Sequence, residues 1–159
     1  MIRAVVPSAL LLAALGAARL QGQQRVRVQP EGRVDVLAAR RTAVHGGIGV
    51  NLPAGRSVRL ELVSAVGAST VGGNTGFSTR LEGVARYLLD PDFVSRWGAY
   101  GGGGLGARYD RGAGWRGVLI ALIGLEGPRW GGVVPFVEAG YGGGARVGAG
   151  VRMAVADRR

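Results

Sequence analysis

Charged side chains recur at alternate positions in several stretches of this sequence, and they form the pattern with the clearest chemical meaning. The set comprises Arg59, Glu61, Arg80, Glu82, Arg86, Arg96, Arg108, Glu138, Arg146 and Arg152. Guanidinium and carboxylate groups form charge-assisted hydrogen bonds, and an ion buried without such a partner costs several kcal/mol. We therefore expect these side chains to pair in a shared interior and to fill it. The alternative is an ion path, which the excess of arginine would bias toward anions.

Residues that could catalyse a reaction or hold a metal are sparse. His45 is the only histidine and the chain has no cysteine, so a multi-histidine or thiolate metal site and a disulfide framework are excluded. A histidine beside a serine can support nucleophilic chemistry, as in barrel-embedded lipid A deacylases, and Ser57 and Ser64 are nearby in the sequence. We favour a hydrogen-bonded structural role for His45.

One stretch has the spacing of a dinucleotide-binding loop. Gly101, Gly103 and Gly106 spell GxGxxG, but that motif requires a helix after it, whereas Leu105 to Tyr109 continues a strand pattern. No phosphate-binding GK[ST], HExxH or GxSxG motif occurs. The sequence therefore predicts no cofactor and no enzymatic activity.

The stretch 136–153 shows most clearly how the charged residues are positioned. Apolar and small side chains occupy one parity, while glycines and Glu138, Arg146 and Arg152 occupy the other. Successive side chains of a strand point to opposite faces, so this period of two indicates β-structure. One apolar face and one face of glycine and charge is typical of a membrane β-barrel, with lipid outside and a polar lumen inside. We expect Val147, Ala149 and Val151 to face lipid, and Arg146, Gly148 and Arg152 to face the lumen.

The same alternation recurs along the chain and defines six arms. They are 33–52, 57–68, 77–88, 96–109, 118–125 and 136–153, of which 118–125 is apolar on both faces. Turn signals or loops are expected at Pro30-Glu31-Gly32, Pro53-Ala54-Gly55-Arg56, 69–76, Asp90-Pro91-Asp92, 110–114 and 127–132.

The first and last arms decide the number of strands. Each is nearly twice the roughly 9 to 11 residues that one membrane crossing needs. Folding each into two strands gives eight, provided that a three-residue loop preserves the parity near Gly142; six long strands remain the alternative.

Composition agrees with this interpretation. The 159 residues suit a single domain, and 31 of them are glycine, which allows backbones to crowd inside a narrow barrel. All 20 basic residues are arginine and they are spread singly, whereas nucleic-acid binding favours a clustered stripe. We expect no nucleic-acid partner.

The chain divides into four segments. Residues 1–22 have a secretory signal pattern, in which Arg3 precedes an apolar core from Ala4 to Ala18 that is short for a membrane span. Residues 23–32 form a short polar lead-in, 33–155 the barrel domain, and 156–159 a C-terminal tail.

Taken together, the signal pattern, antiparallel meander, short turns alternating with longer loops and inward charges resemble the small OmpA/OmpX-type outer-membrane barrels, from about Arg33 to Met153. The match is architectural and carries no diagnostic motif. It implies an all-β fold, an antiparallel meander closed into a small transmembrane barrel in the outer membrane of a diderm bacterium. It also implies a non-catalytic structural or interaction role, with outer-membrane lipid and the outer-membrane assembly machinery as partners. The sequence does not indicate a specific protein partner. The alternatives are a narrow anion-leaning channel, a soluble secreted ligand-binding β-barrel and a lipid-modifying barrel enzyme.

Overall fold

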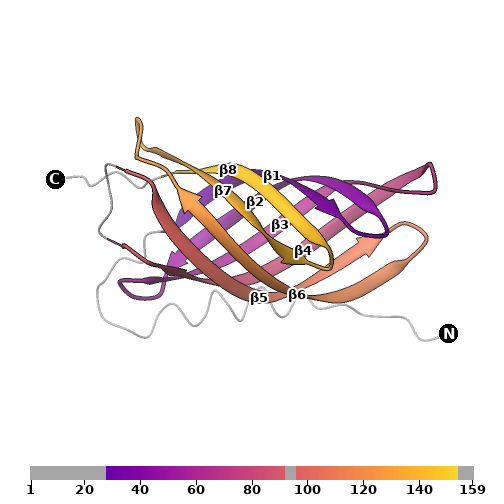
Figure 1. Cartoon of the computed structure of the whole chain (residues 1–159), viewed down its shortest axis with the longest axis horizontal. Coiled ribbons are helices and arrows are strands. Elements are labelled where there is room, and N and C mark those ends of the chain that lie inside the picture. The colour runs from indigo at the N-terminus through magenta and orange to yellow at the C-terminus, as the bar shows by residue number, and fades with distance from the viewer. Residues whose placement is uncertain (1–27, 92–95, 154–159) are drawn as a thin grey trace.

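The computed structural model describes residues 28–91 and 96–153, which fold into a closed barrel of eight antiparallel strands, each paired with its neighbour in the sequence (Figure 1). The strands are β1 (Gln29–Ala38), β2 (Thr42–Pro53), β3 (Val58–Val71), β4 (Asn74–Leu88), β5 (Gly98–Asp110), β6 (Gly114–Glu126), β7 (Val133–Gly142) and β8 (Ala145–Met153). Pairing of β1 with β8 closes the barrel. The predicted all-β meander and the count of eight strands are confirmed.

Side chains alternate between the interior and the outer surface as the sequence pattern predicts. On β8, Arg146, Gly148 and Arg152 are buried in the barrel, whereas Val147 and Val151 are exposed outside it. The same alternation recurs on the other strands, except where β6 begins at the hairpin end, so the barrel has a lumen wall and an outer wall with different compositions.

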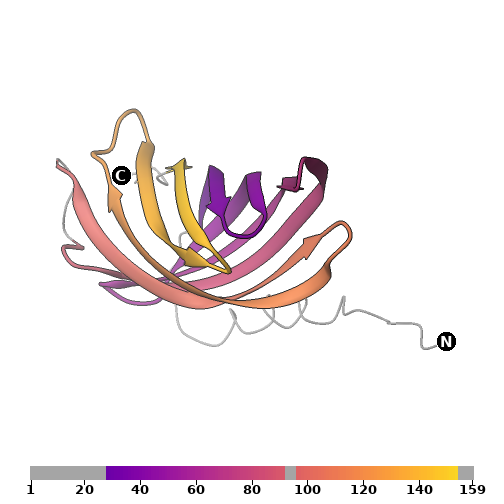
Figure 2. The ribbon, with the colours of Figure 1, turned by 45° about the vertical axis from the view of Figure 1, so that its right-hand side comes forward.

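Connections of two lengths alternate along the chain. Short turns of two or three residues join β1 to β2, β3 to β4, β5 to β6 and β7 to β8, and they lie together at the right-hand end of Figure 1. We call this the hairpin end. The longer connections β2 to β3, β4 to β5 and β6 to β7 lie at the opposite end, where the described chain begins and ends. Figure 2 shows the hairpins of β3–β4 and β5–β6 extending further than that of β7–β8.

The turn between β3 and β4 is shorter than the sequence indicates. In place of a polar loop over 69–76, the two strands pair up to Val71 and Asn74 and leave only Gly72 and Gly73 as the turn. Both glycines have positive φ, which two-residue hairpins of type I′ require. The polar residues misled the prediction because they lie in the paired ends of the hairpin.

Of two further boundaries, the first differs from expectation and the second agrees with it. The barrel begins at Gln29, four residues before Arg33. Pro30 does not prevent this, because it pairs only with β2 and lies at the start of its strand, where proline is tolerated. In the last arm, Tyr141 pairs with Ala145, so three residues separate the final pair and the parity is preserved. That is the loop length which the eight-strand prediction needs.

The outer wall is a continuous apolar band. Large exposed side chains on it include Val36, Ile48, Leu62, Leu81, Leu105, Leu119, Ile123, Val137 and Val147, which come from all eight strands. Aromatic residues flank the band: Tyr87, Trp97 and Trp130 at one end, and Phe77, Tyr109 and Trp115 at the hairpin end. The rings of Tyr109 and Trp115 pack with their centroids 5.6 Å apart.

Inward-facing glycines allow the strongly curved strands to approach one another. A Cβ atom on Gly104 would lie 2.0 Å from the carbonyl oxygen of Gly83, and one on Gly67 would lie 1.9 Å from that of Val44. These positions exclude any side chain, because backbone atoms already occupy the space.

We therefore expect Gly104→Ala to lower the free energy of unfolding by about 1 to 3 kcal/mol, as overpacking does. Gly103→Ala is the matched control, because its Cβ would face outward with its nearest contact at 3.4 Å. Urea titrations of both variants, refolded in phosphatidylcholine vesicles, test the prediction. Equal stabilities would contradict it.

The described part of the chain contains no apolar helix long enough to cross a membrane. The predicted signal sequence (1–22) and C-terminal tail (156–159) lie outside the described residues.

Candidate functional site

The lumen is filled by ionic side chains, and among the described residues the fully buried charges balance. Six arginines and six carboxylates are at most 5% exposed. They are Arg33, Arg80, Arg86, Arg108, Arg146 and Arg152, with Glu31, Asp35, Glu61, Glu82, Asp110 and Glu138. The net charge of +10 of the chain is therefore not carried by this interior.

Glu138 on β7 is the centre of the network. Its Oε2 accepts hydrogen bonds from Arg33 Nη2 at 2.5 Å and from Arg146 Nη2 at 3.1 Å. Its Oε1 accepts one from the Tyr100 hydroxyl at 2.8 Å and also pairs with Arg86. One carboxylate thus joins β1, β4, β5 and β8 across the lumen.

A second junction forms around Asp35 on β1. Arg33 donates to it from Nε and Nη2, both at 3.0 Å, in the two-pronged geometry that guanidinium and carboxylate groups favour. Arg80 on β4 also pairs with Asp35, while Arg146 donates to Glu82 at 2.7 Å. Each buried charge in this part of the lumen is shared among strands that are not adjacent in the barrel.

Aromatic and aliphatic side chains complete the packing. The guanidinium carbon of Arg152 lies 4.0 Å from the centre of the Phe136 ring, and Arg33 and Arg86 lie 5.5 and 5.6 Å from it. These are cation–π contacts. Ile120 and Leu122 point inward and form a buried apolar cluster with Val84, Leu88 and Tyr100. The inward-facing side chains of 118–125 are apolar because they pack on other side chains of the lumen.

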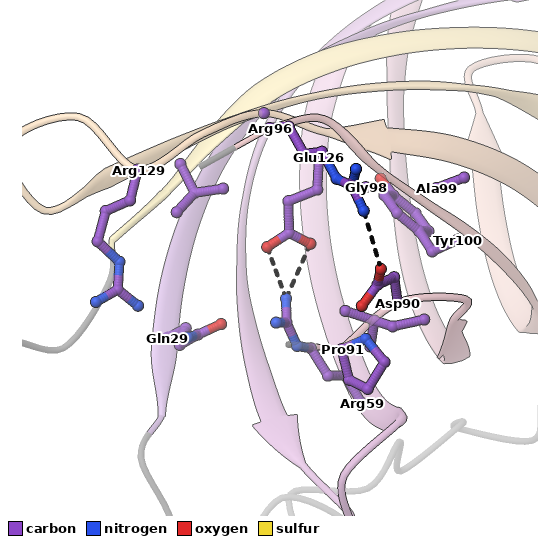
Figure 3. Close-up of a pocket in the computed structure, with 13 residues that line it drawn as sticks. Gln29, Arg59, Asp90, Pro91, Arg96, Gly98, Ala99, Tyr100, Glu126 and Arg129 are labelled. Carbon is purple, nitrogen blue, oxygen red and sulfur yellow. Dashed lines mark hydrogen bonds and ion pairs between the residues drawn. The ribbon is translucent and has the colours of Figure 1, made fainter. Parts of the chain in front are cut away.

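The lumen ends in a small cavity of about 140 Å³ at the end opposite the hairpins (Figure 3). There Arg59 Nη1 donates to both oxygens of Glu126 at 2.9 Å, and Figure 3 shows this pair crossing the opening. Arg152 Nη1 donates to the same carboxylate at 2.9 Å. Arg59 is thus half-buried at the mouth, linked through Glu126 to the interior network.

Arg96 is the one predicted lumen residue that the structure places outside the strands, at the edge of the mouth cavity. It precedes β5 by two residues, is exposed, and lies 3.8 Å from Asp90 in the connection between β4 and β5 (Figure 3). The alternation in the sequence runs past the start of the strand, so parity alone assigned Arg96 to the interior.

Several members of the network were absent from the predicted set. Arg33 and Asp35 have lumen parity in the sequence, but their role as junctions depends on partners on distant strands. Glu31 accepts hydrogen bonds from Asn51 and Arg152, and the turn signal of Pro30-Glu31-Gly32 concealed it. Asp110 was assigned to a loop, yet it ends β5 and is fully buried.

His45 has a serine partner, although not Ser57 or Ser64. Its Nε2 lies 2.8 Å from Ser78 Oγ, and Ser78 donates to Asp110 Oδ1 at 2.7 Å. Since the only hydroxyl hydrogen of Ser78 is directed to Asp110, Ser78 must accept from Nε2–H of His45. This direction is opposite to the one in which a histidine base activates a serine, and all three residues are fully buried. The arrangement is a structural hydrogen-bond chain.

In residues 28–91 and 96–153, no group of three or more histidine or acidic side chains could hold a metal ion. Every carboxylate of the lumen junctions described above is occupied by an arginine.

No protein-family model matches the sequence, and no curated protein matches it. Several solved structures are similar, including the following two. One is the crystal structure of the N-terminal β-barrel domain of OprF from Pseudomonas aeruginosa, with a TM-score of 0.55 and 20% identity over 79% of this chain and 95% of that one. The other is the solution NMR structure of the de novo designed protein TMB2.3, with a TM-score of 0.51 and 14% identity over 84% of this chain and 99% of that one. At these identities the likeness shows a common barrel fold.

Proposed function

We propose that this chain is a non-catalytic outer-membrane barrel with a structural or interaction role and a lumen closed by its own side chains. The main observation behind the proposal is that charged side chains lie inside the barrel and apolar side chains outside it, the reverse of a soluble protein. Twelve ions are buried inside the barrel, and large apolar residues such as Ile48, Leu119 and Ile123 are 70% exposed or more outside it. A membrane barrel has this arrangement, since lipid solvates the outer wall.

The outer wall disfavours a soluble ligand-binding barrel. Soluble monomers rarely expose contiguous apolar patches larger than a few hundred Å², and here the apolar band extends around all eight strands. The likeness to the OprF barrel domain agrees with the resemblance of the sequence to OmpA/OmpX-type barrels.

The lumen disfavours an anion channel. Its buried arginines are matched by an equal number of carboxylates, and Phe136, Tyr100 and the apolar cluster occupy space between them. Small barrels enclose little more than their own side chains. The excess of positive charge that would attract anions is not in the interior.

The hydrogen-bond direction at Ser78 and the burial of His45 disfavour a lipid-modifying enzyme. The proposal also includes export by a signal sequence and a location in the outer membrane of a diderm bacterium. Its expected partners are lipid and the assembly machinery.

The proposal is tested in two steps. Density-gradient fractionation of expressing cells should recover the chain with the outer membrane, and the purified barrel should leave planar bilayers without steady single-channel currents. Phe136→Ala with Arg152→Ala removes two stacked side chains next to Glu126 at the mouth, and a current that this variant alone passes would identify them as part of the closure. Recovery in the soluble periplasm would refute the membrane location, and steady currents from the wild type would refute the closed lumen.

A further inference from the structure

The mouth at the hairpin end holds an open basin of about 280 Å³. It is formed by three of the four hairpins and is lined by Arg41, Val71, Asn74, Thr75, Gly76 and Arg111. No carboxylate lines it, in contrast to the cavity at the other end, whose walls include Asp90 and Glu126.

The two arginines of the basin are held in place by the backbone. The amide of Arg111 donates to the carbonyl oxygen of Phe77 at 2.9 Å, and its side chain lies against Gly76, where a Cβ atom would be 3.1 Å from Arg111 Cβ. Arg41 Nη1 donates to the carbonyl oxygen of Arg111 at 3.5 Å. Arginines from the β1–β2 and β5–β6 turns therefore line one basin with the β3–β4 hairpin, and the Arg41 guanidinium reaches the backbone of Arg111.

Nearby negative charge is already engaged. Asp110, next to Arg111 in the sequence, is fully buried and accepts hydrogen bonds from Ser78, Arg108 and Arg116. The charge of Arg41 and Arg111 is thus not offset by this carboxylate, whereas the lumen below is balanced.

We propose that this basin binds a phosphate group. Arginine presents a planar fork of donors that matches phosphate oxygens, and two such forks lining one basin can engage one phosphate together. Asn74 adds a neutral amide donor to the lining. Such a phosphate belongs either to a soluble phosphate compound or to a phosphorylated lipid headgroup, because the aromatic pair Tyr109 and Trp115 places the membrane surface close to this end.

The experiment compares Arg41→Gln and Arg111→Gln with Arg40→Gln. Arg40 is exposed in the same turn as Arg41 and does not line the basin, so its variant removes the same charge from the same loop. One arm titrates inorganic pyrophosphate into the barrel in zwitterionic detergent. The other counts, by native mass spectrometry, the lipid A molecules retained from phosphatidylcholine nanodiscs that contain lipid A or its dephosphorylated form. All variants are first checked for folding by the electrophoretic shift on heating.

We expect each basin variant to weaken binding by about tenfold or more, since a hydrogen bond to a charged group contributes about 1.5 to 3 kcal/mol, and Arg40→Gln to change it little. Pyrophosphate binding with this pattern would support a soluble ligand; retention of lipid A but not of its dephosphorylated form, with the same pattern, would support a lipid headgroup. Binding in neither arm, or equal loss in Arg40→Gln, would overturn the proposal.

Discussion

Glu138→Gln is expected to lower the free energy of unfolding by about 3 to 5 kcal/mol, the cost of breaking a buried ion pair by removing one partner. The substitution keeps the shape of the side chain and removes only its charge. Arg33, Arg86 and Arg146 would then share a lumen with one carboxylate fewer, and none of them can reach water from a fully buried position. Urea titrations in phosphatidylcholine vesicles, followed by the fluorescence of the three outward tryptophans, measure the change.

Glu126→Gln is the matched control. Glu126 also pairs with two arginines, Arg59 and Arg152, but its side chain is 17% exposed at the mouth, so water can compensate for the lost charge. We expect a loss of about 1 kcal/mol, as for exposed ion pairs.

A double variant tests whether the lost stability of Glu138→Gln comes from the unequal number of buried charges. Glu138→Gln combined with Arg86→Met removes one cation as well, so the number of buried positive and negative charges is equal again. Part of the lost stability should return. If both single variants lost the same stability and the double variant recovered none, the lumen would not act as a balanced network.

The fold was predictable because its information is local. The period of two assigns each side chain to a wall, as on β8, and short turn signals divide the chain. The eight strands followed from parity, since a three-residue loop after Tyr141 keeps odd residues outside on both β7 and β8. The error at 69–76 has the same origin: polarity suggested a loop, where only Gly72 and Gly73 form the turn.

The contacts of the site were not predictable because they depend on how the sheet closes. Arg33 and Glu138 are 105 residues apart, and His45 meets Ser78 from 33 residues away on a strand that is not its neighbour. Parity reports that such residues share an interior, but the height at which each side chain enters the lumen is set by the stagger of the strands. Parity also fails at strand ends. Arg96 lies two residues before β5 begins, so its charge is in the connecting loop instead of inside the barrel.

Leu81→Arg should lower the free energy of unfolding by about 2 to 4 kcal/mol in a bilayer, the cost of arginine on the lipid face near the midplane. Leu81 is on the outer wall of β4 and is 53% exposed. It lies between the outward aromatics of the same strand, four residues from Phe77 and six from Tyr87, which marks it as central in the apolar band. Leu81→Ala measures the part of the loss that comes from the missing side chain rather than from the charge.

Thr75→Arg places the same charge on the same face of β4, two residues beyond Phe77, where the band ends. Near the interface the cost of the charge falls to about 0 to 1 kcal/mol, and Thr75→Ala measures the part that comes from the lost hydrogen bond between Thr75 and Thr70. The comparison is made by urea titration in phosphatidylcholine vesicles, after the electrophoretic shift on heating has shown that each variant is folded. On the outer wall of a soluble barrel, an arginine at either position would point into water and cost nothing measurable. Equal free energies of unfolding for Leu81→Arg and Thr75→Arg would therefore show that the apolar band is not embedded in lipid. If Leu81→Arg is less stable by about 2 kcal/mol or more, the band lies in the bilayer.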